Sequence, residues 1–158
     1  MAHDILVVDD EADIRLLISG LLEDEGFETR QAANADQALA AVAGRRPNLI
    51  ILDVWLEDSR LDGIELLQEL QNTGPEVPVV MISGHGTIEM AVSAIHAGAF
   101  DFIEKPFKTD RLLLVIERAI ADTRLRRELE DLRRRAGAEA DLIGGSAAIK
   151  AIRQAIAK

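Results

Sequence analysis

Short runs of branched apolar residues recur along the chain, and they restrict the fold more than any other feature of the sequence. The clearest runs are DILVV at 4–8, LIIL at 49–52 and VPVVMI at 77–82. Each run is rich in β-branched residues and too short for a helix of ordinary length. Runs that are apolar throughout, without alternating polar residues, are typical of parallel strands that are buried on both faces. We therefore predict three central strands.

Segments with helical periodicity separate these runs, and two weaker strand candidates complete the series. FETRQA at 27–32 alternates as an edge strand would, and FDFIE at 100–104 is the last candidate. Glycines follow four of the helical segments, where a left-handed residue commonly ends a helix; they are Gly26, Gly44, Gly74 and Gly98. The helical patterns lie at 12–25, 35–44, 63–72 and 88–97, and a long one begins near 109.

This alternation makes five consecutive βα units. Strands joined through helices run parallel, and right-handed crossovers place helices on both faces of the sheet. We therefore predict an α/β fold with a doubly wound parallel sheet, of the flavodoxin-like (βα)5 type with strand order 2-1-3-4-5. The long last pattern predicts an extended C-terminal helix.

Acidic residues stand directly after two of the predicted central strands. Asp9 and Asp10 follow the first run, and Asp53 follows the run at 49–52. In the predicted topology these strand ends meet at the point where ligands bind to doubly wound sheets. Clustered carboxylates repel one another, and a hard divalent cation such as Mg²⁺ would relieve that repulsion. The alternative is that Asp10 and Glu11 are acids at a helix start, where the helix dipole favours negative charge.

Composition excludes several classes of function. The chain has no cysteine, which leaves no thiol or disulfide chemistry, and its formal net charge of −10 opposes binding to a nucleic-acid backbone. The first residues, MAHDILVV, do not resemble a signal peptide, and the sequence contains no apolar run long enough to cross a membrane. We therefore expect a cytoplasmic protein that binds neither membrane nor, in this portion, nucleic acid.

The last part of the chain differs in composition from the rest. Residues 123–136, TRLRRELEDLRRRA, continue the fifth helix in pattern and carry Leu125, Leu129 and Leu132 at spacings of four and three. This stripe fits either one solvated helix or a short parallel dimer coil. A new amphipathic helix with Ser146 as its N-cap is predicted within 142–158, and we expect the chain to belong to a longer protein.

Four motifs in order resemble the receiver domain of bacterial two-component response regulators. They are VVDDE at 7–11, LIILDV at 49–54, MISG at 81–84 and FIEKPF at 102–107, and the likeness covers about residues 3 to 122. Any one of these motifs would be weak, whereas the set is specific. The resemblance implies a signalling module that receives a phosphoryl group from a sensor histidine kinase, without being a turnover enzyme.

The resemblance also implies a role for each matched site residue. Asp53 would be the nucleophile that attacks a phosphohistidine. Lys105 would offset the charge on the transferring group, and its bond to Pro106 would be cis. Mg²⁺ would be the cofactor, held by Asp9, Asp10, Asp53 and the backbone carbonyl of Trp55.

Two further matches concern the conformational switch of this family. Ser83 matches the switch hydroxyl that binds a phosphoryl oxygen, and Phe102 matches the switch aromatic. Phosphorylation would then favour the state with Ser83 drawn inward and Phe102 packed behind it. A serine that ends a strand and an aromatic on a last strand are also common for structural reasons alone.

The sequence departs from the usual receiver pattern after Asp53. The segment VWLEDSRL is about two residues longer than the common loop and lacks its usual proline. Together with DLIGGSAAIKAIRQAIAK at 141–158, it resembles the NtrX branch of NtrC-type regulators. That branch implies a receiver domain at 1–122, a helical linker at 123–141 and the start of a truncated AAA+ domain at 142–158. An NtrY-like sensor kinase, a homodimer and transcription control through absent AAA+ and DNA-binding domains are implied as well.

Three other readings compete with a working receiver. A flavodoxin-like cofactor module would need a phosphate-binding loop where Asp9 and Asp10 stand, and these acids would repel the phosphate. A hydrolase of the haloacid-dehalogenase type would need a second aspartate where Trp55 stands. A degenerate receiver would serve only as a dimerisation module, but the complete set of matched acids, serine and lysine opposes that reading.

Overall fold

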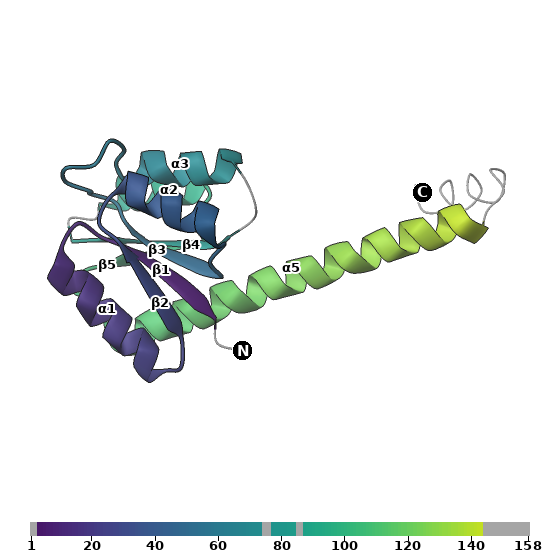
Figure 1. The fold of residues 1–158 in the computed structure, drawn as a ribbon, viewed down its shortest axis with the longest axis horizontal. Helices are drawn as coiled ribbons and strands as arrows, with labels where there is room; N and C mark the ends of the chain where they lie inside the picture. Colours follow the sequence, from purple (N-terminus) through teal and green to yellow (C-terminus); the bar gives the residue numbers. More distant parts are fainter. Residues whose placement is uncertain (1–2, 74–76, 85–86, 144–158) are drawn as a thin grey trace. The chain divides into compact units, whose positions relative to one another are not determined.

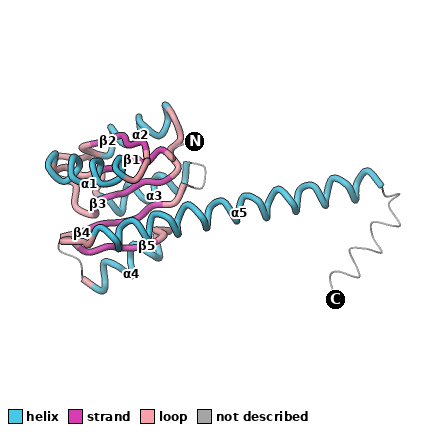
Figure 2. Tube along the Cα trace, turned by 90° about the horizontal axis from the view of Figure 1, so that it is seen from below, coloured by secondary structure: helices cyan, strands magenta, loops and turns pink. Residues whose placement is uncertain are grey.

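The computed structural model describes residues 3–73, 77–84 and 87–143. The chain divides by compactness into two units, 1–123 and 124–158. In the first unit five parallel strands form one sheet in the order β2-β1-β3-β4-β5 (Figure 1). Figure 2 shows the strands following one another in this order. The strands are β1 Asp4–Val8, β2 Glu28–Ala32, β3 Leu49–Asp53, β4 Val79–Ser83 and β5 Asp101–Glu104.

Five helices alternate with the strands, so the predicted flavodoxin-like (βα)5 fold is confirmed. Their bounds agree closely with the helical patterns of the sequence. The helices are α1 Ala12–Asp24, α2 Ala35–Gly44, α3 Gly63–Thr73, α4 Ile88–His96 and α5 Thr109–Ile143. In the described part of the chain, no helix combines the length and the apolar character that a bilayer crossing requires.

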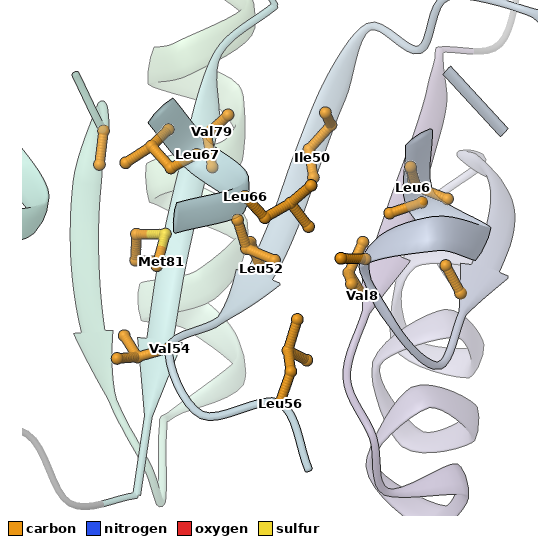
Figure 3. Close-up of a cluster of buried hydrophobic side chains, with 14 of the residues drawn as sticks. Leu6, Val8, Ile50, Leu52, Val54, Leu56, Leu66, Leu67, Val79 and Met81 are labelled. Atoms are coloured by element: carbon orange, nitrogen blue, oxygen red, sulfur yellow. The ribbon is translucent and has the colours of Figure 1, made fainter. Parts of the chain in front are cut away.

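The central strands are buried on both faces, as their uninterrupted apolar runs predict. Every residue of β1, β3 and β4 is buried, whereas β2 at the edge is mostly open. Alternate side chains enter different cores. Leu6 and Val8 belong to the core beneath α2, α3 and α4, which Figure 3 shows, whereas Ile5 and Val7 belong to the core beneath α1 and α5. Burial on both faces fixes the register of each strand against its neighbours, and therefore the position along the sheet at which each strand ends.

The glycine predictions were only partly right. Gly26 and Gly98 have positive φ values of 91° and 109° and follow helices as expected. Gly44 is instead the last residue of α2, and the chain leaves that helix through Arg45 in an extended conformation. The next strand begins only a few residues later, so an extended exit leads into it directly and a left-handed cap at Gly44 is not needed. Gly74 lies outside the described residues.

The fifth helix continues through the charged segment, as its pattern predicts. α5 extends to Ile143 without a break. Leu125, Leu129 and Leu132 are all exposed on it. The predicted division into receiver, linker and AAA+ start stays a prediction, and the helix expected to begin at Ser146 lies outside the described residues.

Candidate functional site

Three aspartates meet at the carboxyl edge of the sheet. Asp9 directly follows β1 and is fully buried, Asp53 is the last residue of β3 and is 4% exposed, and Asp10 is partly exposed. One carboxylate oxygen from each of them lies within 4.8 Å of the others. β1 and β3 are neighbouring strands with Val8 opposite Leu52, so Asp9 and Asp53, each the next residue along, lie side by side.

Lys105 reaches this cluster from the loop after β5. Its Nζ lies 2.9 Å from Oδ2 of Asp9 and 3.3 Å from Oδ2 of Asp53. The backbone N–H of Lys105 donates to the carbonyl of Ser83 at 2.7 Å, and the peptide bond from Lys105 to Pro106 is cis. The lysine is thus held by its own backbone while its ammonium lies between two buried carboxylates.

The charges of the cluster are incompletely balanced. Burial and the neighbouring charge of Asp9 raise the pKa of Asp53 from 3.8 to about 6, against the opposing effects of Lys105 and of the Trp55 backbone N–H. Burial acts to lower the pKa of Lys105, but its hydrogen bond to Asp9 and the charges of both acids outweigh burial and raise that pKa above 10.5. Lys105 therefore stays charged at neutral pH, and one lysine does not neutralise all three acids.

Backbone groups hold the acids in place. The N–H of Glu11 donates to Asp9 Oδ1 at 2.9 Å, and the N–H of Trp55 donates to Asp53 Oδ1 at 3.3 Å. The N–H of Glu57 donates to Asp10 Oδ2 at 3.1 Å. Each carboxylate is thus oriented by a donor that cannot rotate away, and oxygen atoms remain available to a ligand.

The donor chemistry of the cluster fits a hard divalent cation. The three ligands are carboxylates, without a sulfur or imidazole donor among them, and such a set suits Mg²⁺ or a similar ion. Burial first, and then the neighbouring charge of Asp9, raise the pKa of Asp53, and a cation bound at the cluster would favour the ionised acid. The side chain of Trp55 is half exposed at the rim of the cluster, and its carbonyl as a fourth ligand stays a prediction.

The two residues matched to the switch lie on neighbouring strands. Ser83 ends β4 and is fully buried, opposite Glu104 in the sheet register. Phe102 lies on β5 opposite Met81, and it is partly buried against the core beneath α4. Their placement is compatible with the switch that the resemblance implies, and the switch itself stays a prediction.

Several residues that shape the site were not identified from the sequence. Arg15 donates from Nη1 to the carbonyl of Asp9 at 2.6 Å. A Cβ on Gly63 would lie 2.1 Å from the carbonyl oxygen of Asp53, so α3 can begin there only with glycine. Gly63 could have been found through the DG pair that starts the third helical pattern, whereas no local pattern indicates a contact between Arg15 and Asp9.

Residues 5–117 match the family model described as the response regulator receiver domain. The chain is 56% identical over 156 residues to the nitrogen assimilation regulatory protein NtrX of Azorhizobium caulinodans, a match that covers 99% of this chain and 34% of that protein. It is 47% identical over 143 residues to a putative NtrX-like response regulator of Rickettsia bellii, covering 90% of this chain and 30% of that protein. The chain therefore spans about a third of the length of these curated relatives.

Solved structures also show similarity to NtrX proteins and to receiver domains. NtrX from Brucella abortus matches with a TM-score of 0.82 and 61% identity, covering 99% of this chain and 34% of that one. The receiver domain of NtrX from the same organism is 66% identical with a TM-score of 0.72, covering 75% of this chain and 98% of that one. The family match spans more than half of the sequence, and an isolated receiver domain is covered almost completely. The chain therefore belongs to the response regulator receiver domain family.

Proposed function

We propose that this chain accepts a phosphoryl group on Asp53 from a sensor histidine kinase, with Mg²⁺ as its cofactor. The single observation that carries this proposal is the grouping of the Asp53 carboxylate with Asp9, Asp10 and the ammonium of Lys105. An acid whose pKa is about 6 is largely ionised at neutral pH and can act as a nucleophile. The family membership of the chain supports the same chemistry.

Each residue has a defined part in the transfer. An oxygen of Asp53 forms a bond to phosphorus while the bond from phosphorus to the kinase histidine breaks. The histidine leaves as a neutral imidazole, because its other ring nitrogen already carries a proton. Lys105 stabilises negative charge on the phosphoryl oxygens. Asp9, Asp10, Asp53 and the Trp55 carbonyl would hold Mg²⁺. When bound, Mg²⁺ supplies positive charge that screens the acids and the phosphoryl oxygens.

Phosphorylation then shifts a conformational equilibrium. The hydroxyl of Ser83 binds a phosphoryl oxygen, and Phe102 packs into the space behind it. Ser83 ends β4 and Phe102 lies on β5, so this movement changes the surface formed by α4, β5 and α5. The protein acts as a stoichiometric switch in the cytoplasm and does not turn over a substrate in the manner of an enzyme.

The output of the switch is control of transcription in a longer, NtrX-like protein. The relatives are about three times as long as this chain, and we propose that the parts that bind DNA lie in the rest of such a protein. We propose that its kinase is NtrY-like and that its active form is a homodimer. The exposed Leu125, Leu129 and Leu132 support a dimer through α5.

Phosphorylation is tested by intact mass measurement. The chain is incubated with acetyl phosphate and Mg²⁺, and we expect an increase by the mass of one phosphoryl group. The Asp53→Asn variant serves as the matched control because it keeps the shape of the site and removes the nucleophile. Wild-type protein that gains no mass, or a variant that gains the same mass, contradicts the proposal.

A receiver that serves only as a dimerisation module is the second candidate, and the leucine stripe is the observation that favours it. In that case the chain would associate without gaining phosphate or binding Mg²⁺. The same mass measurement separates the two candidates, since only a working receiver is modified on Asp53.

A further inference from the structure

The loop between β3 and α3 is closely held despite its unusual length. It comprises residues 54–62, and several of its residues contact the rest of the domain. Leu56 is 8% exposed and packs in the core beneath α2, α3 and α4 (Figure 3). Gly63, directly after the loop, donates its N–H to the Val54 carbonyl at 2.8 Å. The loop is therefore closed at its base and anchored by a buried side chain.

Ser59 fastens the middle of this loop to the start of α2. Its Oγ accepts a hydrogen bond from the backbone N–H of Ala35 at 2.9 Å. Ala35 is the first residue of α2 and is fully buried, so its N–H has neither a partner within the helix nor access to bulk water. Asn34 caps the same helix through Gln37 and leaves this donor to Ser59. The loop thus satisfies a donor that α2 cannot satisfy itself.

The same loop orients one of the three site aspartates. The N–H of Glu57, two residues before Ser59, donates to Asp10 Oδ2 at 3.1 Å. Asp10 is the most exposed member of the acidic cluster, so packing restrains its carboxylate least. The orientation of that carboxylate therefore depends most on a hydrogen-bond donor. The other contact of the loop with α2, from Arg60 to Asp36 at 3.2 Å, joins two exposed side chains and contributes little.

We propose that Ser59 is a positioning residue for the cation site, because it fastens the loop to α2 and thereby holds the Glu57 N–H on the Asp10 carboxylate. This inference rests on the proposed function, in which Asp10 is a ligand of Mg²⁺. Groups that hydrogen-bond to a metal ligand reduce its freedom before the ion arrives, and their loss weakens metal binding. The affinity for Mg²⁺ then depends on the first turn of α2, which itself provides no ligand.

The test is a titration with Mg²⁺ followed by the fluorescence of Trp55, the only tryptophan of the chain. We expect Ser59→Ala to weaken Mg²⁺ binding by about 5- to 10-fold, because its effect reaches the ligand through a backbone donor. Ser59→Thr keeps the hydroxyl and should retain the wild-type affinity. Arg60→Ala, which removes the exposed contact to Asp36, is the matched control and should also retain it.

A second pair of variants changes the loop through its backbone. Asp58 has a φ of 53°, which proline cannot adopt and asparagine tolerates. Asp58→Pro should weaken Mg²⁺ binding at least as much as Ser59→Ala, whereas Asp58→Asn removes the same charge and should bind more tightly than Asp58→Pro. Thermal melts of all variants without Mg²⁺ confirm that the titrations are made on folded protein.

The possible failures are distinguishable. If wild-type protein shows no response to Mg²⁺, the cation site of the proposed function is lost and this inference with it. If wild-type protein binds Mg²⁺ and Ser59→Ala binds it equally well, the inference is overturned while the proposed function stands. A variant that melts at a lower temperature but keeps its Mg²⁺ affinity also overturns it, because Ser59 would then only stabilise the fold.

Discussion

Lys105 Nζ lies 2.9 Å from Oδ2 of Asp9, although 96 residues separate them in the sequence. The same ammonium lies 3.3 Å from Asp53. Asp9 is fully buried, so its charge has little contact with solvent and depends on Lys105 as a partner. The electrostatic balance of the site thus depends on a contact between the first and last βα units.

The raised pKa of Asp53 makes the stability of the metal-free protein dependent on pH. Its value is about 6 in the folded protein and near 3.8 when the chain is unfolded. Between these values the unfolded chain loses its proton first, so ionisation of Asp53 lowers the free energy of unfolding as the pH rises. A shift of this size corresponds to at most about 3 kcal/mol.

Asp53→Asn should therefore stabilise the metal-free protein at pH 7 and have little effect near pH 4. Urea unfolding of both proteins at several pH values measures the difference. A difference in unfolding free energy that stays constant from pH 4 to pH 7 would show that Asp53 ionises normally in the folded state.

Replacing Lys105 by methionine should destabilise the metal-free protein. The change keeps a similar stem but leaves Asp9 and Asp53 without their cation, and breaking such a partly buried ion pair costs about 2–4 kcal/mol. Mg²⁺ should recover part of this loss, because it supplies positive charge at the same acids. Lys108→Met, at an exposed position in the same loop, is the control. Equal stability of both variants in urea would contradict the prediction.

Gly63→Ala should displace the carboxyl end of β3. The added Cβ would lie 2.1 Å from the Asp53 carbonyl oxygen and 2.7 Å from the Val54 Cα, and both of these are backbone atoms. We expect a loss of unfolding free energy of about 2 kcal/mol or more, together with slower phosphorylation. Gly20→Ala in α1 meets nothing within 4 Å and should instead be neutral or stabilising. Calorimetry and the mass measurement check both effects, and a Gly63→Ala variant that behaves like Gly20→Ala would refute the prediction.

The leucine stripe of α5 should mediate self-association. Leu125, Leu129 and Leu132 are 65%, 49% and 61% exposed, which is unusual for a row of leucines on one helix face. Small-angle scattering at concentrations on the order of tens of micromolar should show a dimer. Replacing all three leucines by alanine keeps helix propensity and should yield a monomer. The control is Arg127→Gln on the same helix, and a wild-type monomer under these conditions would exclude the proposed contact.

Much of the site could be predicted because short strands restrict where their ends lie. Once the runs at 4–8 and 49–52 are neighbouring parallel strands, the residues that follow them must share one edge of the sheet. The positions of Asp9 and Asp53 thus follow from local pattern and topology together. Lys105 was found only through its motif, since nothing in its local sequence indicates a partner near the start of the chain.

The sequence by itself determined the order of the elements, the buried faces of the strands and the edge at which the acids gather, because these depend on hydrophobic periodicity. Only the tertiary structure decided the contacts around those acids: Arg15 on the Asp9 carbonyl, Gly63 against the backbone of Asp53, and Ser59 on the N–H of Ala35. Such contacts join different segments of the chain, and the local pattern of one segment says nothing about the other. They depend on differences in distance that hydrophobic periodicity does not encode. The predicted left-handed cap at Gly44, which the structure does not use, shows the same limit at a helix end.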